Sequence, residues 1–164
     1  TFPDRFPLRL IEIALGGSGF SRLFKDLREK RRWAYSFDVV SANYEDTGYF
    51  AVYCAADPRH ARSVEREIFR HLANICEKGL ESRELKCEKE QYKGNLLRRF
   101  ETNLSVARIA GIETLLAGKF EPFETAMGKI ESVRNSAIIQ AARMYLRPER
   151  AVVVTAGEKG PDNV

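Results

Sequence analysis

Two stretches of sequence decide the fold: AYSFDVVSAN at residues 34–43 and GYFAVYCAA at residues 48–56. Both are rich in aromatic and β-branched residues, which favour extended strands. The residues between them, YEDT at 44–47, are typical of a turn. We therefore predict that the two stretches pair as an antiparallel β-hairpin.

Helices are expected on the N-terminal side of this hairpin. Pro7 suits the first turn of a helix that runs to about Leu15, and the glycine-rich segment 16–19 interrupts it. Residues 20–31 then have the spacing of a second amphipathic helix. One side of that helix would comprise Phe20, Leu23, Phe24 and Leu27.

The chain after the hairpin is predominantly helical. Apolar periodicity predicts a helix ended by Gly79, a long second one, a third stopped by Gly118, and short helices at 122–132 and 135–146. The run AVVVTA at residues 151–156 predicts a short third strand, followed by a tail at residues 157–164.

These elements indicate one α+β domain over residues 1–164, with helices packed on one side of an antiparallel sheet. Three strands make a thin sheet for so many helices, and a strand supplied from before Thr1 would extend it.

Composition and charge narrow the class of protein. The chain has 164 residues, 44% of them apolar and 30% charged, as in an ordinary globular domain. No apolar run approaches the roughly 18 residues of a membrane span, so we expect no membrane partner. The net charge of +4 is too small to favour nucleic acid.

All of that net charge lies between residues 22 and 32, where the six basic residues outnumber the two acidic ones, Asp26 and Glu29. This segment is either a solvated helix face with Arg22/Asp26 and Lys25/Glu29 pairs, or a patch for an anionic or carbonyl-rich partner.

Most catalytic motifs are absent from the sequence. The segment 16–21 lacks both the third glycine of a dinucleotide fingerprint, where Arg22 stands, and the Gly-Lys-Ser/Thr of a phosphate-binding loop. The nearest approach to a metal site is Glu67 and His71 on one helix face, which is more typical of a surface contact, so we expect no metal in this chain.

Three widely spaced cysteines favour a reducing compartment. We therefore expect a cytoplasmic location, or a periplasmic one if a signal peptide has been removed.

An ordered set of motifs carries a family resemblance. The runs ALGGSGFSRLF at 14–24 and LREKRRWAYS at 27–36 resemble the C-terminal homologous domain of the pitrilysin/insulinase-type zinc metallopeptidases. That family includes mitochondrial processing peptidases, non-peptidase core subunits of respiratory complexes, and bacterial zinc proteases. The likeness continues through DTGYF at 46–50 to the closing valine-rich run, and covers about residues 6 to 156.

The resemblance implies particular roles. Such proteins pair two related domains around a chamber: one carries His-x-x-Glu-His and the zinc, and the other supplies an Arg and a Tyr seven residues later. Here these map to Arg28 and Tyr35, while Gly16, Gly17 and Gly19 would flank the substrate. The chain departs from the family's run at Arg32-Trp33, where the family often has Gly-Leu or a similar pair, and this adds charge and bulk beside the site.

The leading hypothesis is the non-zinc half of a zinc metalloendopeptidase, as a fragment or subunit that is inactive alone. It would act on a peptide or unfolded protein substrate together with a zinc-bearing homologous domain or subunit. The alternative is a structural paralogue that has lost proteolysis and serves in assembly. A third hypothesis, a basic nucleic-acid module, predicts binding that weakens steeply with salt.

Overall fold

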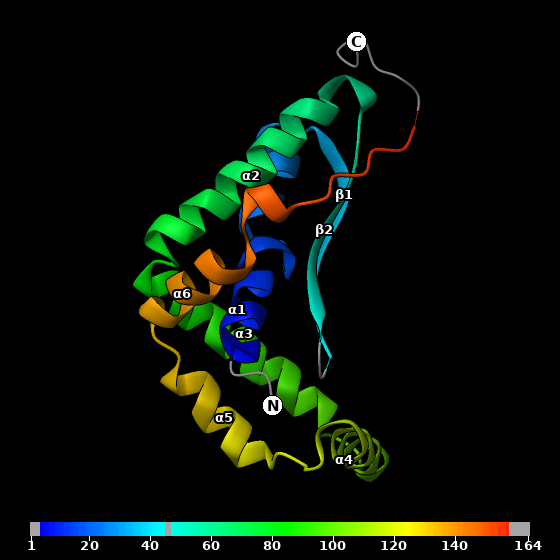
Figure 1. Cartoon of the computed structure of the whole chain (residues 1–164), viewed down its shortest axis with the longest axis vertical. Coiled ribbons are helices and arrows are strands. Elements are labelled where there is room, and N and C mark those ends of the chain that lie inside the picture. The colour runs from blue at the N-terminus through cyan, green and yellow to red at the C-terminus, as the bar shows by residue number, and fades with distance from the viewer. Residues whose placement is uncertain (1–3, 45–46, 158–164) are drawn as a thin grey trace.

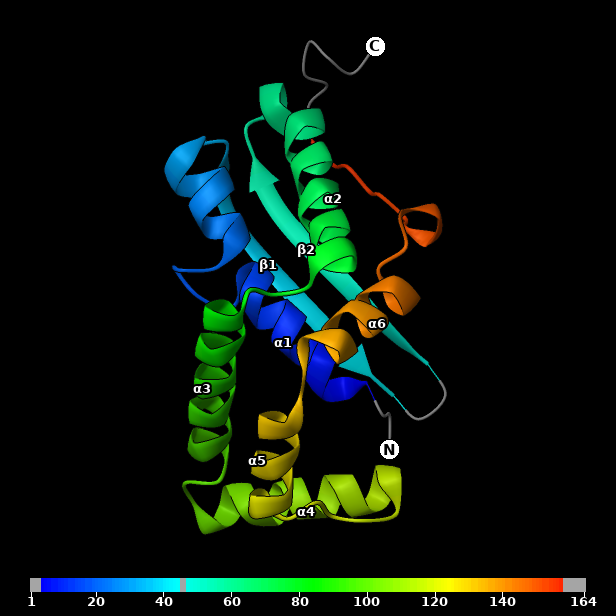
Figure 2. The same cartoon turned by 90° about the vertical axis from the view of Figure 1, so that its left-hand side faces the viewer.

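The computed structural model describes residues 4–44 and 47–157. A two-stranded antiparallel hairpin carries helices on one of its faces, and the other face is left open (Figures 1 and 2). This is the predicted α+β arrangement. In chain order the elements are α1 (Arg5–Gly16), the π-helix η1 (Phe24–Lys30), β1 (Ala34–Asn43), β2 (Gly48–Ala56), the 3₁₀ turn η2 (Pro58–His60), α2 (Ala61–Lys78), α3 (Ser82–Arg99), α4 (Asn103–Ala117), α5 (Phe123–Ser132), α6 (Asn135–Tyr145) and the 3₁₀ turn η3 (Pro148–Arg150).

The hairpin has the predicted bounds. Val39 of β1 lies opposite Val52 of β2, and an irregularity between Ala34 and Ser36 interrupts the register. Alternate residues, including Val39 and Val52, point to the helices and pack on the core. The opposite face carries the exposed tyrosines Tyr49 and Tyr53. Tyr35 sits at the irregularity, where a bulge turns a side chain away from the regular alternation.

Helix α1 forms the centre of the core. Its residues Leu10, Ile11 and Leu15 are almost fully buried, and the helix packs against β1, α3 and α6. The buried carboxylate of Glu12 accepts hydrogen bonds from the backbone N–H and hydroxyl of Ser41, at 3.1 and 2.5 Å. These bonds satisfy a buried charge and tie α1 to β1.

The predicted helix ends are found at the two glycines. Gly79 ends α2 with φ of 71°, and Gly118 ends α4 with φ of 70°, a region that glycine adopts without steric cost. The turn after α2 is held by Asn135 of α6, whose side-chain oxygen accepts from the Leu80 N–H at 2.8 Å and whose amide donates to the Lys78 carbonyl at 2.9 Å.

The third strand predicted at residues 151–156 is not formed. This segment is extended but unpaired, and Val152 is 87% exposed. A strand needs a neighbour for its backbone hydrogen bonds, and within the described residues β1 and β2 pair with each other alone. Valine-rich composition was therefore insufficient to predict a strand. Apart from Gly157, the predicted tail lies outside the described residues.

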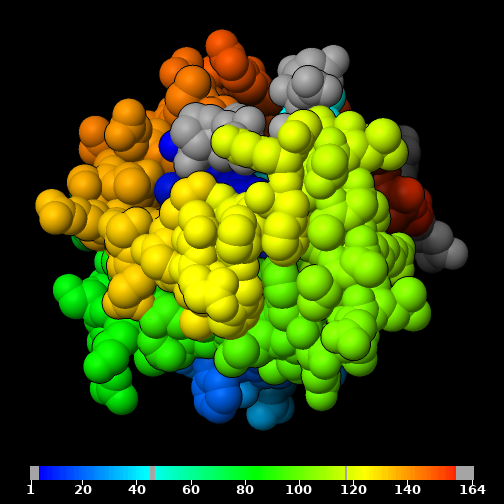
Figure 3. All heavy atoms as spheres, turned by 90° about the horizontal axis from the view of Figure 1, so that it is seen from below, coloured from blue at the N-terminus to red at the C-terminus, as the bar shows by residue number. Residues whose placement is uncertain are grey.

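Helices α4 and α5 form the end of the molecule farthest from η1. Seen from below, they make up most of that surface (Figure 3). Among the described residues, α4 contributes none to the buried set, and Leu104 and Leu115 are strongly exposed. None of the helices in the described part of the chain has the length and hydropathy needed to cross a membrane.

Candidate functional site

The central part of the segment that carries the charge excess, Phe24–Lys30, is the π-helix η1. In η1 the backbone N–H of Arg31 donates to the Asp26 carbonyl at 3.0 Å, an i→i+5 bond in place of the α-helical i→i+4 bond. This winding turns Asp26 and Leu27 inward and leaves Arg28 exposed. The predicted apolar side of this helix is wrong at Phe20, which lies before the helix in the glycine loop and is 83% exposed.

Asp26 is the centre of an ionic cluster that joins η1 to α2. Its carboxylate accepts from Arg31 Nε and Arg70 Nη2, both at 2.8 Å, and lies 2.9 Å from His71 Nε2. Burial raises the pKa of Asp26, but the hydrogen bonds and charges of Arg31 and His71 outweigh it and hold the pKa below its usual value. Glu67 joins the cluster through Arg31 and Arg70.

Arg22 fixes the beginning of the same segment against α3. Its Nε and Nη2 donate to the two carboxylate oxygens of Glu84 at 2.7 and 2.6 Å, and Nη1 donates to Asn74 at 3.0 Å. The predicted Arg22/Asp26 pair is therefore wrong, because each residue has partners on another helix. With these charges paired, the exposed cations of the segment include Arg28, Lys30 and Arg32.

The structure brings Arg28 and Tyr35 together. Arg28 Nη1 donates a hydrogen bond to the backbone carbonyl oxygen of Tyr35, and its guanidinium lies 5.8 Å from the centre of the Phe24 ring. Tyr35 is 62% exposed, so its hydroxyl is accessible to a ligand. The contact therefore joins the Arg28 side chain to the backbone of Tyr35, and both residues are exposed at the end of the hairpin.

The three candidate glycines lie in different surroundings. A Cβ on Gly16 would come within 2.5 Å of Val39 Cγ2, and one on Gly17 within 2.7 Å of Ile13 Cα. These two glycines therefore permit the close approach of α1 to β1 and the tight exit from α1. A Cβ on Gly19 would meet only the Phe24 ring, near 3.9 Å. Gln91 of α3 donates to the Gly17 carbonyl at 2.8 Å and anchors the loop.

The described residues do not fit a zinc ion. They contain no group of three or more His, Cys, Asp or Glu side chains that could hold a metal. Glu67 and His71, the nearest approach in the sequence, are instead engaged by the Asp26 cluster. Burial lowers the pKa of His71, although the hydrogen bond with Asp26 and the charge of Asp26 act to raise it.

Sequence reasoning missed two residues near the site. Arg59 of η2 lies near the start of β1, because the Asp57 N–H donates to the Trp33 carbonyl at 3.3 Å, although 24 positions separate Arg59 from Tyr35. Glu88 of α3 is buried near Arg22 and Lys25, and its Oε2 has no hydrogen-bond partner among the described residues. Each depends on contacts between distant segments, so the local sequence contained no signal for either.

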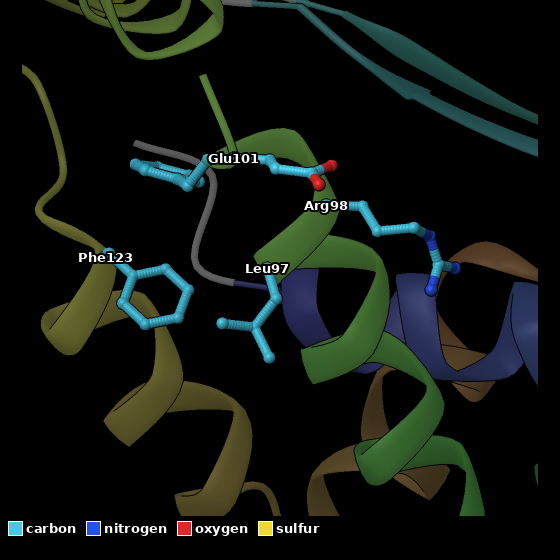
Figure 4. A pocket seen from close by; sticks show the side chains of 5 residues that line it. Leu97, Arg98, Glu101 and Phe123 are labelled. Carbon is cyan, nitrogen blue, oxygen red and sulfur yellow. The ribbon is translucent and has the colours of Figure 1, made fainter. Parts of the chain in front are cut away.

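One cavity among the described residues is distant from Arg28 and Tyr35. It has a volume of about 610 Å³ and lies where α3 meets α5, lined by Leu97, Phe100 and Phe123 together with Arg98 and Glu101 (Figure 4). This is the end of the molecule opposite η1 (Figure 2). None of the candidate site residues lines it.

Solved structures share this fold. The peptidase M16 inactive domain from Pseudomonas fluorescens superposes with a TM-score of 0.78 at 20% identity, over 88% of this chain and 35% of that chain. The fold and the motifs define the chain as a domain of the zinc-peptidase type. The family model described as the peptidase M16 inactive domain matches residues 1–92, and the chain belongs to this family. The resemblance seen in the ordered motifs is thereby confirmed.

Curated relatives are longer than this chain. The protein named "Uncharacterized zinc protease YmxG" of Bacillus subtilis is 30% identical over 149 residues, which is 91% of this chain and 36% of the relative. Cytochrome b-c1 complex subunit 2 of Homo sapiens is 22% identical over 143 residues, 87% of this chain and 32% of that protein. The chain thus spans about a third of the length of the curated relatives it matches.

Proposed function

We propose that this chain is the non-zinc half of a zinc metalloendopeptidase and completes the active site of a zinc-bearing homologous domain or subunit. The observation that carries the proposal is that Arg28 and Tyr35 are both exposed and are joined by the hydrogen bond from the Arg28 guanidinium to the Tyr35 carbonyl oxygen. The zinc ion, its ligands and the general base would all come from the partner, since the described residues offer no ligand set. The substrate would be a peptide or an unfolded protein.

Each residue has a distinct chemical role in this proposal. Arg28 presents guanidinium donors that suit the carbonyl oxygens of an extended peptide. Its bond to the Tyr35 carbonyl oxygen uses one donor and leaves others on the exposed side. The Tyr35 hydroxyl would donate to the oxyanion that develops when water attacks the scissile carbonyl.

The glycine loop would form part of the chamber wall. Gly16 and Gly17 hold the loop close to the sheet and α3, while Gly19 and Phe20 are exposed. A wall of exposed backbone with one exposed aromatic ring suits contact with an extended peptide. This arrangement supports a substrate-handling role for the loop.

The test is peptide cleavage by the assembled protein, with variants Tyr35→Phe and Arg28→Ala. Loss of an oxyanion donor typically lowers kcat by about 100-fold or more, and we expect a loss of that order for Tyr35→Phe. Arg28→Ala should mainly raise KM. The matched controls are Tyr53→Phe, an exposed tyrosine of β2, and Arg66→Ala, an exposed cation of α2. Unchanged kcat/KM in both site variants would refute the proposed roles.

A second candidate is a structural subunit without proteolysis. The similarity to cytochrome b-c1 complex subunit 2 favours this alternative, because that protein is named as a subunit of an assembly. The two candidates differ in the partner. Co-purification with a chain that contains His-x-x-Glu-His and cleaves peptides would support the protease half. Co-purification with partners that all lack this motif would favour the structural subunit.

A further inference from the structure

The turn η2 is fixed beside the first residues of β1. The backbone N–H of Asp57 donates to the Trp33 carbonyl at 3.3 Å, and the His60 ring stacks on the Trp33 ring with centroids 5.1 Å apart. Arg31 adds a guanidinium 4.7 Å from the centre of the same indole. Trp33 is therefore an anchor that holds η2 next to Tyr35, two residues further along the chain.

Arg59 projects from this anchored turn with a fixed orientation. Its Nε and Nη2 donate to the carboxylate oxygens of Asp57 at 3.1 and 2.7 Å, and Asp57 also accepts from the Arg59 backbone N–H at 2.9 Å. These hydrogen bonds raise the pKa of Arg59, and the nearby Tyr35 phenol adds to the effect. The side chain is 71% exposed, and Nη1 has no partner among the described residues.

We propose that Arg59 is a substrate-binding residue of the Arg28–Tyr35 site and that it binds a carboxylate of the peptide. A guanidinium can bind carboxylates along more than one edge. Asp57 occupies the edge formed by Nε and Nη2, so the outward edge formed by Nη1 and Nη2 is available. That edge presents two parallel N–H donors, which match the two oxygens of a carboxylate.

The charges around the site support the same ligand. Asp57 is already paired with Arg59, whereas the adjoining segment exposes the cations Arg28, Lys30 and Arg32 against one exposed carboxylate, Glu29. A bound carboxylate would thus meet a local excess of positive charge. The inference rests on the proposed function, since it assigns a ligand to the same site. The carboxylate would belong either to an acidic side chain or to the C-terminus of the peptide.

The experiment measures binding of three fluorescent peptides of one sequence to the 164-residue chain by anisotropy at low ionic strength. One carries a single Glu and an amidated C-terminus, the second replaces Glu by Gln, and the third has Gln and a free C-terminal carboxylate. We expect one carboxylate-bearing peptide to bind about threefold to tenfold more tightly than the neutral one. The peptide that shows the preference identifies the source of the carboxylate.

Variants then test the assignment to Arg59. Arg59→Gln should abolish the preference, whereas Arg66→Gln, which removes an exposed arginine of α2, should keep it. Arg59→Lys should lose most of the preference, because an ammonium group cannot reproduce the two-edged geometry. Equal binding of all three peptides by the unaltered chain, or a preference retained in Arg59→Gln, would overturn the proposal. Circular dichroism of each variant confirms that it is folded.

This binding assay is independent of catalysis. Tyr35→Phe should keep the carboxylate preference while it lowers kcat of the assembled protein by about 100-fold or more. If Arg59→Gln retains the preference but Tyr35→Phe blocks cleavage, only the role proposed for Arg59 is refuted, and the role proposed for Tyr35 stands. If the preference depends on Arg59 but Tyr35→Phe cleaves normally, the proposed catalytic role fails instead.

Discussion

Glu88 offers a test of how η1 is held against α3. The side chain is 9% exposed, and Oε2 lacks a hydrogen-bond partner among the described residues. Burial, with a further contribution from Glu84, raises the pKa of Glu88 from 4.5 to about 7, against the opposing charges of Lys25 and Arg22. The folded chain therefore keeps this carboxyl protonated at a pH where the unfolded chain ionises it.

The sign and size of the effect follow from proton linkage. Between pH 4.5 and about 7 the folded state binds more protons at Glu88 than the unfolded state, so stability falls as the pH rises through this range. A tenfold change in proton affinity is worth about 1.4 kcal/mol, so the whole difference is about 3 kcal/mol. Between pH 5 and pH 8 the titration of Glu88 should lower the free energy of unfolding of the unaltered chain by roughly 2 kcal/mol.

Glu88→Gln removes the titration while it keeps the size of the side chain. The free energy of unfolding in urea, measured at pH 5 and pH 8, should be similar for the two proteins at pH 5. At pH 8 the variant should be the more stable by roughly 2 kcal/mol. The control is Glu77→Gln, which replaces an exposed carboxyl of α2 and should change stability by less than about 0.5 kcal/mol at both pH values. A difference between Glu88→Gln and the unaltered chain that does not vary with pH would refute the reasoning.

Two further substitutions test η1 and its junction with β1. Asp26→Asn removes the charge that pairs with Arg31 and Arg70, and should lower the free energy of urea unfolding by about 1–3 kcal/mol at pH 7. Because the pKa of Asp26 is lowered, this difference should shrink below about pH 4, and a constant difference would contradict the assignment. Arg32→Gly should raise Tm or leave it unchanged, because Arg32 adopts φ of 57°, a region that favours glycine. A clear fall in Tm would show that the Arg32 side chain contributes contacts of its own.

The hairpin and the helix ends could be predicted because their causes are local. Alternating aromatic, β-branched and small residues define both strands and bury one face, so the bounds 34–43 and 48–56 follow from residue type. Gly79 and Gly118 end their helices through their own backbone conformation. These features need no knowledge of which segments meet in space.

The errors have causes that are not local. An α-helical winding was expected over residues 20–31, but the ion pairs of Asp26 with Arg31 and with Arg70 of α2 fit a π-helix instead. Residues 151–156 have the composition of a strand, but composition cannot supply the neighbour that a strand requires. In both cases a contact with a distant segment, or the lack of one among the described residues, decided the structure.

The candidate site shows the same difference between residues found from local sequence and residues that depend on contacts between distant segments. Arg28 and Tyr35 were assigned from a motif, and their contact is compatible with the short spacing between them. Spacing gave no indication that Gly16 has a packing role against Val39, because that role depends on how α1 crosses β1. Arg59 was missed because it joins the site through an aromatic stack and a turn formed after the second strand.

The departure from the family's usual run at Arg32-Trp33 can now be interpreted in structural terms. Arg32 stands where the family often has glycine, and it adopts the left-handed conformation that glycine favours, at some cost in strain. The bulk of Trp33 does not fill the exposed site, because its ring packs on the core and stacks against His60. The substitution thereby fixes the turn that carries Arg59. The added bulk of Trp33 thus acts through its contacts with η2, the turn to which Arg59 belongs.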